Sequence, residues 1–192
     1  MDSPAEATQP FMRLRATSIL GLSLVWLLSV GDGRAQESQP TEYQIKAAFL
    51  FNFARFVEWP PVAFAGATSP VVIGILGENP FGGDLERTIQ NKTINNRSIV
   101  IKQLHSLAEA TNCQVLFIST SEKARLVEIF DGLRGTSVLT VSETDGFTDA
   151  GGKINFVREG KKIRFQINDE AAKKAKLKIN SKLLSLAFHP AH

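Results

Sequence analysis

Apolar residues along this chain gather in short runs that alternate with segments of helical periodicity. Runs such as VVIGILG and CQVLFIS contain no charged residue, which indicates strands covered on both faces. Strands are expected at residues 71–77, 97–104, 113–119 and 137–143, with helices between them at residues 84–92 and 121–133. Alternation of strands and helices predicts a three-layer α/β fold, in which a mostly parallel sheet carries helices on both faces.

The pattern changes after the fourth strand. Residues 153–168, KINFVREGKKIRFQIN, alternate between apolar and polar residues on either side of Glu159-Gly160. Such alternation about a glycine predicts a β-hairpin near the carboxyl terminus. Two short helices are expected in the tail, at residues 169–177 and 181–188.

The segment EYQIKAAFLFNFARF, residues 42–56, predicts a helix with apolar residues on nearly every side. A helix at a protein surface normally keeps a polar face, so this one needs cover from more than one element. Thr41 and Gln44 match a capping box at its start, and Pro60 with Pro61 should end it.

Two apolar faces are assigned to this helix. Phe49, Phe53 and Phe56 lie one and two turns apart and are expected to face the sheet. A second face then remains, made of Leu50, Phe51 and Ala54 beside Trp59.

Either the tail helix at residues 181–188 covers this second face, or the face binds a second copy of the chain or a partner protein. For the latter case we predict that Phe51 and Trp59 point outward, with Arg55 and Glu58 at the rim. Large aromatic side chains dominate contact energetics, whereas rim charges contribute little.

The amino-terminal segment predicts export. Arg13 and Arg15 precede an uncharged run at residues 16–30, which is shorter than the roughly 20 residues of a transmembrane helix. Small residues follow at 33–35, as in a secretory signal peptide. We therefore expect residues 1–35 to be cleaved, with an uncleaved membrane anchor as the alternative.

The remaining chain, residues 36–192, is expected to form a single domain in the periplasm. Either Met1 or Met12 serves as the start, because Asp2 and Glu6 do not suit a signal peptide. The net charge of +3 is too small for a nucleic-acid-binding footprint. Cys113, the single cysteine, is predicted to be buried in its strand.

Ligands of open parallel sheets bind beyond the carboxyl ends of the strands. Three loops are expected at that edge, at residues 77–84, 119–123 and 142–147. The first is glycine-rich but lacks the spacing of a phosphate-binding loop. The candidate ligand-binding residues in these loops are Glu78, Asn79, Phe81, Ser119 and Glu143. The alternative is that they are ordinary turn residues and solvated acids.

Motifs of catalysis are missing from the sequence. His105, His189 and His192 are the only histidines, and none belongs to a zinc-binding pattern. The chain also lacks the Gly-x-Ser-x-Gly elbow of serine hydrolases. We therefore predict no catalytic residue, no metal and no cofactor, although Ser-His-Asp catalysis through His105 remains open.

Several segments together resemble the YfiR/HmsC-like family. They are YQIKAAFLFNFARFVEWP, VVIGILGENPFGGDL, CQVLFIS, LTVSETDGFTDAGGKINF and IRFQINDEAAKKAKLKINSKLLSLA. The resemblance covers almost all of the chain after the signal segment. Better-known members carry additional cysteines in disulfides, whereas this chain has only Cys113.

This resemblance implies a non-catalytic periplasmic regulator. The partner would be the periplasmic sensor domain of an inner-membrane diguanylate cyclase, or another envelope receptor. Repression of such a cyclase would lower cyclic di-GMP and biofilm formation. A periplasmic small-molecule receptor that uses the strand-end loops is the second hypothesis, and a hydrolase is the third.

Overall fold

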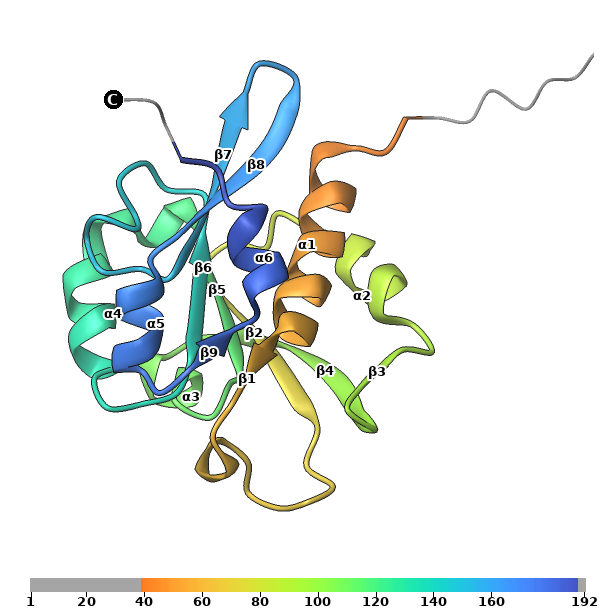
Figure 1. Ribbon diagram of the computed structural model, residues 1–192, viewed down its shortest axis with the longest axis vertical. Helices are drawn as coiled ribbons and strands as arrows, with labels where there is room; N and C mark the ends of the chain where they lie inside the picture. Colours follow the sequence, from red (N-terminus) through yellow and green to blue (C-terminus); the bar gives the residue numbers. More distant parts are fainter. Residues whose placement is uncertain (1–38, 190–192) are drawn as a thin grey trace, which may run out of the picture. The chain divides into compact units, whose positions relative to one another are not determined.

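The computed structural model describes residues 39–189 and contains a seven-stranded sheet with the order β3-β4-β2-β5-β6-β7-β8 (Figure 1). Its strands are β2 (Val71–Leu76), β3 (Thr93–Ile94), β4 (Arg97–Leu104), β5 (Val115–Ile118), β6 (Leu139–Ser142), β7 (Ile154–Glu159) and β8 (Lys162–Ile167). The five central strands are parallel, and β3 and β8 pair antiparallel at the two ends. The predicted mixed α/β class and the mostly parallel sheet are confirmed.

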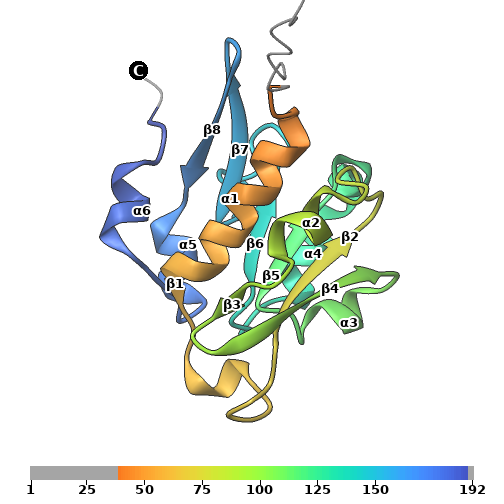
Figure 2. The ribbon, with the colours of Figure 1, turned by 90° about the vertical axis from the view of Figure 1, so that its right-hand side faces the viewer.

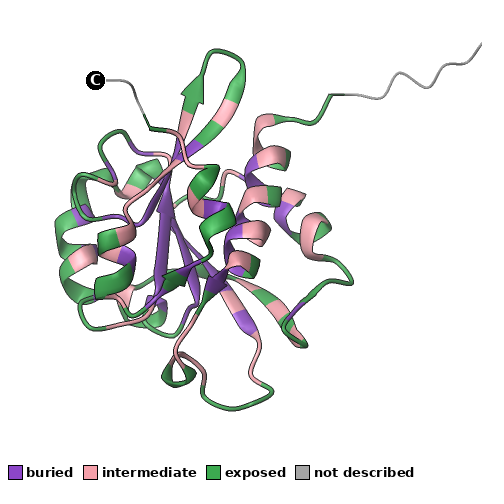
Figure 3. Ribbon diagram, in the orientation of Figure 1, coloured by how far each residue is buried: buried purple, intermediate pink, exposed green. Residues whose placement is uncertain are grey.

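Helices lie on both sides of this sheet. They are α1 (Glu42–Phe56), α2 (Asp84–Ile89), α3 (Leu107–Ala110), α4 (Leu126–Gly132), α5 (Asp169–Lys174) and α6 (Ser181–Ser185), with 3-10 turns η1 (Pro61–Ala63) and η2 (Thr120–Arg125). Successive residues of β5 point to opposite faces, so Val115 and Phe117 join the core under α1 while Leu116 and Ile118 join the core under α3 and α4. The central strands are therefore buried on both faces (Figure 3).

Helix α1 begins as predicted from the sequence, but it ends before the two prolines that were expected to stop it. Thr41 and Gln44 form the predicted capping box. The helix ends at Phe56, before the two prolines, because the next residues form a short strand. This strand, β1 (Val57–Glu58), pairs antiparallel with β9 (Lys178–Ile179) from the tail.

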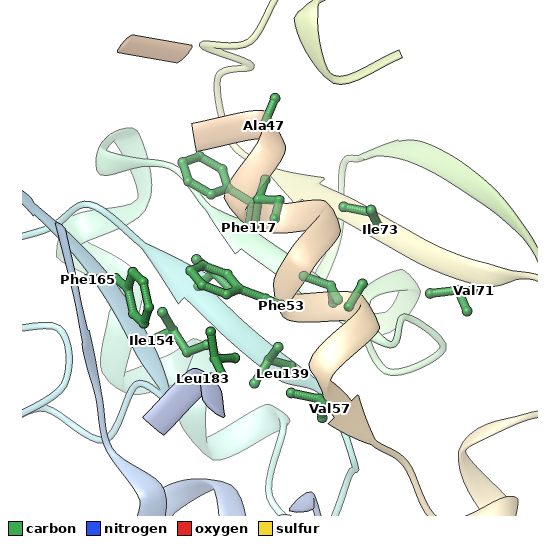
Figure 4. Close-up of a cluster of buried hydrophobic side chains, with 14 of the residues drawn as sticks. Ala47, Phe53, Val57, Val71, Ile73, Phe117, Leu139, Ile154, Phe165 and Leu183 are labelled. Carbon is green, nitrogen blue, oxygen red and sulfur yellow. The ribbon is translucent and has the colours of Figure 1, made fainter. Parts of the chain in front are cut away.

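The sheet curls around α1, which explains why the helix is apolar on so many sides (Figure 2). Helix α2 lies along one flank of α1 and α6 along the other. Phe53 is fully buried and points from α1 toward Phe165 and Ile154 (Figure 4). Its ring centroid lies 5.0 Å from that of Phe165.

Leu50 and Ala54, which the sequence placed on the second face of α1, are both fully buried in the core and are not free for a partner. The centre of the buried face follows Ala47, Leu50 and Ala54, which are spaced by three and four residues and so share one side of a helix. Phe49 is partly buried and packs, as predicted, against the sheet at β8, where its ring centroid is 5.3 Å from that of Phe165.

Burial of Cys113 is confirmed, since only 3% of the residue is exposed. Its sulfur occupies the space beside Gly74, where an added Cβ would lie 2.7 Å from Sγ. Burial raises the pKa of the Cys113 thiol to about 11, so the thiolate is scarcely populated at neutral pH. The residue acts as a small core hydrophobe.

Candidate functional site

The glycine-rich loop after β2 is held by hydrogen bonds from its backbone to two side-chain oxygens. The backbone N–H of Glu78 donates to Ser121 Oγ (3.0 Å), and the N–H of Phe81 donates to Asn79 Oδ1 (2.9 Å). Phe81 itself is buried, with its ring centroid 4.8 Å from that of Phe117. The loop therefore presents Glu78 and Asn79 to solvent, whereas Phe81 belongs to the core.

The next strand end holds Ser119, which begins the turn η2. Ser119 is buried, and its Oγ accepts a hydrogen bond from the N–H of Ser121 (3.4 Å). This contact caps the first backbone donors of the turn. Ser119 thus has a local structural role at the edge where ligand binding was predicted.

Glu143, which follows β6, belongs to a network of ionised side chains. Lys46 on α1 is only 4% exposed, and its ammonium group pairs with Glu143 and with Glu42 (2.5 Å). Tyr43 donates its hydroxyl to Glu143 Oε1 (3.2 Å), and Arg158 on β7 pairs with Glu42. Helix α1 supplies Glu42, Tyr43 and Lys46 to the network. Glu42 and Lys46 can pair because they lie one turn apart on the helix.

Charges alternate along this network, from Arg158 through Glu42 and Lys46 to Glu143. Burial, followed by the nearby carboxylate of Glu143, raises the pKa of Tyr43. The Lys46 ammonium also lies 4.7 Å from the centroid of the Tyr43 ring. Two carboxylates and an aromatic face thus compensate the buried lysine, which ties the start of α1 to the carboxyl end of β6.

The network forms one wall of a cleft of about 380 Å³ at the carboxyl ends of the strands. The cleft is lined by Glu42, Lys46, Thr120, Glu143, Asp145, Phe156, Val157, Arg158 and Ile163. Of the five predicted ligand residues, only Glu143 lies there. Sequence reasoning missed Lys46, although a lysine within the apolar side of a helix, four residues after Glu42, is a visible signal.

Replacing Lys46 by Met should lower the free energy of unfolding by about 2–3 kcal/mol, somewhat below the roughly 3–5 kcal/mol of fully buried pairs. The cost is moderated because the side chains of Glu42 and Glu143 keep 30% and 14% exposure. Urea unfolding measures the change, with Lys161→Met in the exposed β7–β8 turn as control. Adding Glu143→Gln should recover part of the loss; an unchanged urea midpoint for Lys46→Met would show that the network does not stabilise the fold.

The predicted contact surface is divided by the structure. Phe51 and Arg55 lie one turn apart on α1, and Phe51 is half-buried beneath the Lys92 ammonium, which is 4.7 Å from its ring centroid. Arg55 is exposed, with its guanidinium carbon 5.7 Å from the centroid of the Phe56 ring. Phe51 and Arg55 therefore flank the exposed side of the helix.

The other two residues of that surface already have partners within the chain. Glu58 is exposed and pairs with Lys178 (3.1 Å) across the β1–β9 strands. The indole N–H of Trp59 donates to the carbonyl oxygen of Gln114 (3.2 Å), and Trp59 is half-buried. Trp59 thus joins the segment after α1, by this hydrogen bond, to the residue that precedes β5.

Candidate membrane spans and metal-binding clusters are both missing from the described part of the chain, residues 39–189. None of its helices has the length and apolar character needed to cross a membrane. Nor does it bring three or more His, Cys, Asp or Glu residues together where they could hold a metal ion. The predicted signal peptide lies outside the described residues.

The described residues form an α/β domain with a network of ion pairs at the carboxyl ends of its strands. The chain belongs to the YfiR/HmsC-like family, whose model matches residues 43–188 and thus spans α1 to α6. This match confirms the resemblance found in the sequence motifs. A search of curated proteins gave no match.

Proposed function

We propose that this protein is a periplasmic, non-catalytic regulator that represses a membrane-bound diguanylate cyclase through the periplasmic sensor domain of that enzyme. Repression would lower cyclic di-GMP and biofilm formation. Membership of the YfiR/HmsC-like family over residues 43–188 is the observation that carries this proposal.

Export is part of the same proposal. The basic residues Arg13 and Arg15, the short apolar run and the small residues up to Ala35 support cleavage before Gln36. A protein so processed would meet the periplasmic domain of its partner directly. Amino-terminal sequencing of the protein recovered from the periplasm tests this step, and recovery of the intact chain in the membrane would favour an anchor.

The contact surface we propose is centred on Phe51 of α1, with Arg55 one turn away at its rim. A large aromatic side chain contributes most to such a surface, and Arg55 adds an exposed charge beside it. Glu58 and Trp59 extend this surface beyond the helix end, with smaller contributions expected because both already have partners in the chain. The occupant is the cyclase sensor domain, or a second copy of the chain if the protein forms a homodimer.

The function is tested by deleting the gene and measuring cyclic di-GMP in the cells. Deletion should raise cyclic di-GMP, and the wild-type chain should restore the lower level. The double variant Phe51→Ala/Arg55→Ala should fail to restore it, because both proposed contacts are removed. Val127→Ala is the matched control, since Val127 is 74% exposed on α4 at the other face of the sheet.

Two outcomes would count against this assignment. Unchanged cyclic di-GMP after deletion would remove the proposed function. Full repression by Phe51→Ala/Arg55→Ala, at a protein level equal to that of the wild type, would leave the function in place and reject the α1 contact surface.

A small-molecule receptor is the second candidate function. The cleft of about 380 Å³ at the strand ends supports it, because ligands of parallel sheets bind at this edge. Glu143 would be its polar anchor, with Phe156 and Ile163 as apolar walls. Ligand-dependent shifts of the Tyr43 NMR signals, lost in Glu143→Gln, would support this site; displacement of the partner by the ligand would join the two functions.

A further inference from the structure

A second buried lysine, Lys153, lies beside Thr140 of β6 and outside the lining of the strand-end cleft. It precedes β7 and is 9% exposed. Its backbone N–H donates to Thr140 Oγ1 (3.1 Å), whereas its ammonium group has neither an ion pair nor a hydrogen bond within residues 39–189. Lys153 thus differs from Lys46, which is also buried but has two carboxylate partners.

Lys153 lines a cavity of about 420 Å³ between α4 and α5, which are neighbours in Figure 1. The walls carry apolar groups from Phe130, Leu133, Ala171 and Ala175. Polar and charged side chains supply most of the remaining lining, so a cavity of this size suits a small molecule with one polar and one apolar end.

The charged residues around the cavity do not neutralise Lys153. Asp149 and Glu170 line the cavity, and both are partly or largely exposed acids. Burial lowers the pKa of Lys153 to about 8, and no neighbouring carboxylate opposes this shift. Asn155, two residues further along the same face of β7, also keeps its Oδ1 buried without a hydrogen-bond partner among the described residues.

Lys153 is largely withdrawn from water and lines this cavity without a salt-bridge partner among the described residues, so an anionic ligand bound there would pair with it. We propose that this cavity binds a small organic carboxylate, with the Lys153 ammonium group as the partner of the carboxylate and the apolar wall around Phe130 as the support for its body. Arg134 and Lys174 also line the cavity and give it more cations than acids. This site is separate from the strand-end cleft and does not depend on the proposed regulatory role.

Benzoate is a suitable probe because it joins one carboxylate to an aromatic ring, and benzamide is its uncharged counterpart. Titration calorimetry should show benzoate binding to the wild-type protein and to Lys161→Met, in which an exposed lysine is removed. Lys153→Met should weaken benzoate binding by about tenfold or more, which is the worth of a charge-assisted hydrogen bond. Benzamide should bind all three proteins weakly.

The pH dependence provides a second measurement that needs no variant. Benzoate binding to the wild-type protein should weaken as the pH rises through about 8, where Lys153 loses its proton. Absence of benzoate binding to the wild type would overturn the proposal. So would equal affinity of the wild type and Lys153→Met, or an affinity that stays constant between pH 7 and pH 9.5.

Discussion

Phe53→Ala is expected to lower the free energy of unfolding by about 3–5 kcal/mol, the usual cost of emptying a core aromatic site. Phe53 is fully buried, and its ring centroid lies within 5.6 Å of that of Phe156 and 5.0 Å of that of Phe165. The change would leave a cavity between α1 and the β7–β8 strands. Thermal or urea unfolding measures the loss.

Phe51→Ala is the matched comparison on the same helix. Phe51 is half-buried and packs at the edge of the core, so its removal should cost distinctly less stability than that of Phe53. If Phe51 contacts the partner as proposed, this variant should lose binding while it stays folded. Equal destabilisation by both variants, with partner binding intact, would show that Phe51 acts only in the core.

The sheet could be predicted because each central strand is encoded locally. Residues 71–76 and 115–118 are apolar at successive positions, as required for strands buried on both faces. The predicted ends were too generous: β5 begins at Val115 rather than Cys113, and β6 spans Leu139–Ser142 rather than residues 137–143. Backbone hydrogen bonding extends one residue before β5, since the Gln114 N–H donates to the carbonyl oxygen of Val72 (3.0 Å).

The orientation of α1 could not be predicted from its phenylalanines alone. These residues mark both flanks of the helix, whereas the small side chains of Ala47 and Ala54 let its centre approach the sheet. The curl of the sheet and the β1–β9 pairing depend on contacts between distant parts of the chain, for example Asn180 N–H to Phe56 O (2.9 Å). Local periodicity carries no information about them.

The candidate sites show the same limit. Glu42 and Lys46 are visible as a helical pair, but their partner Glu143 lies 97 residues beyond Lys46. Lys153 directly precedes a strand with alternating residues, which gives no sign that its side chain is buried. Its burial depends on the preceding loop, in which Gly152 packs so closely on Phe147 that a Cβ would collide with the ring.

Lys153→Met is expected to stabilise the protein near neutral pH by up to roughly 3 kcal/mol, because it removes a buried cation without a counterion. Methionine has a similar length and can fill the same apolar path. Urea unfolding at pH 7 measures the gain. Lys161→Met serves as control, since an exposed lysine should change stability by only a few tenths of a kcal/mol.

The pH dependence identifies the cause of this gain. The pKa of Lys153 is about 8 in the folded protein and 10.5 in its reference state, so the unfolded chain binds more protons between these values. The stability of the wild type should therefore rise relative to Lys153→Met as the pH increases from about 8 to 10.5, and the advantage of the variant should fade. Cys113 titrates in both proteins and cancels in this difference. If the two unfolding free energies stay parallel over this range, the Lys153 ammonium group is hydrated in the folded protein, and the cavity beside it lacks an uncompensated charge.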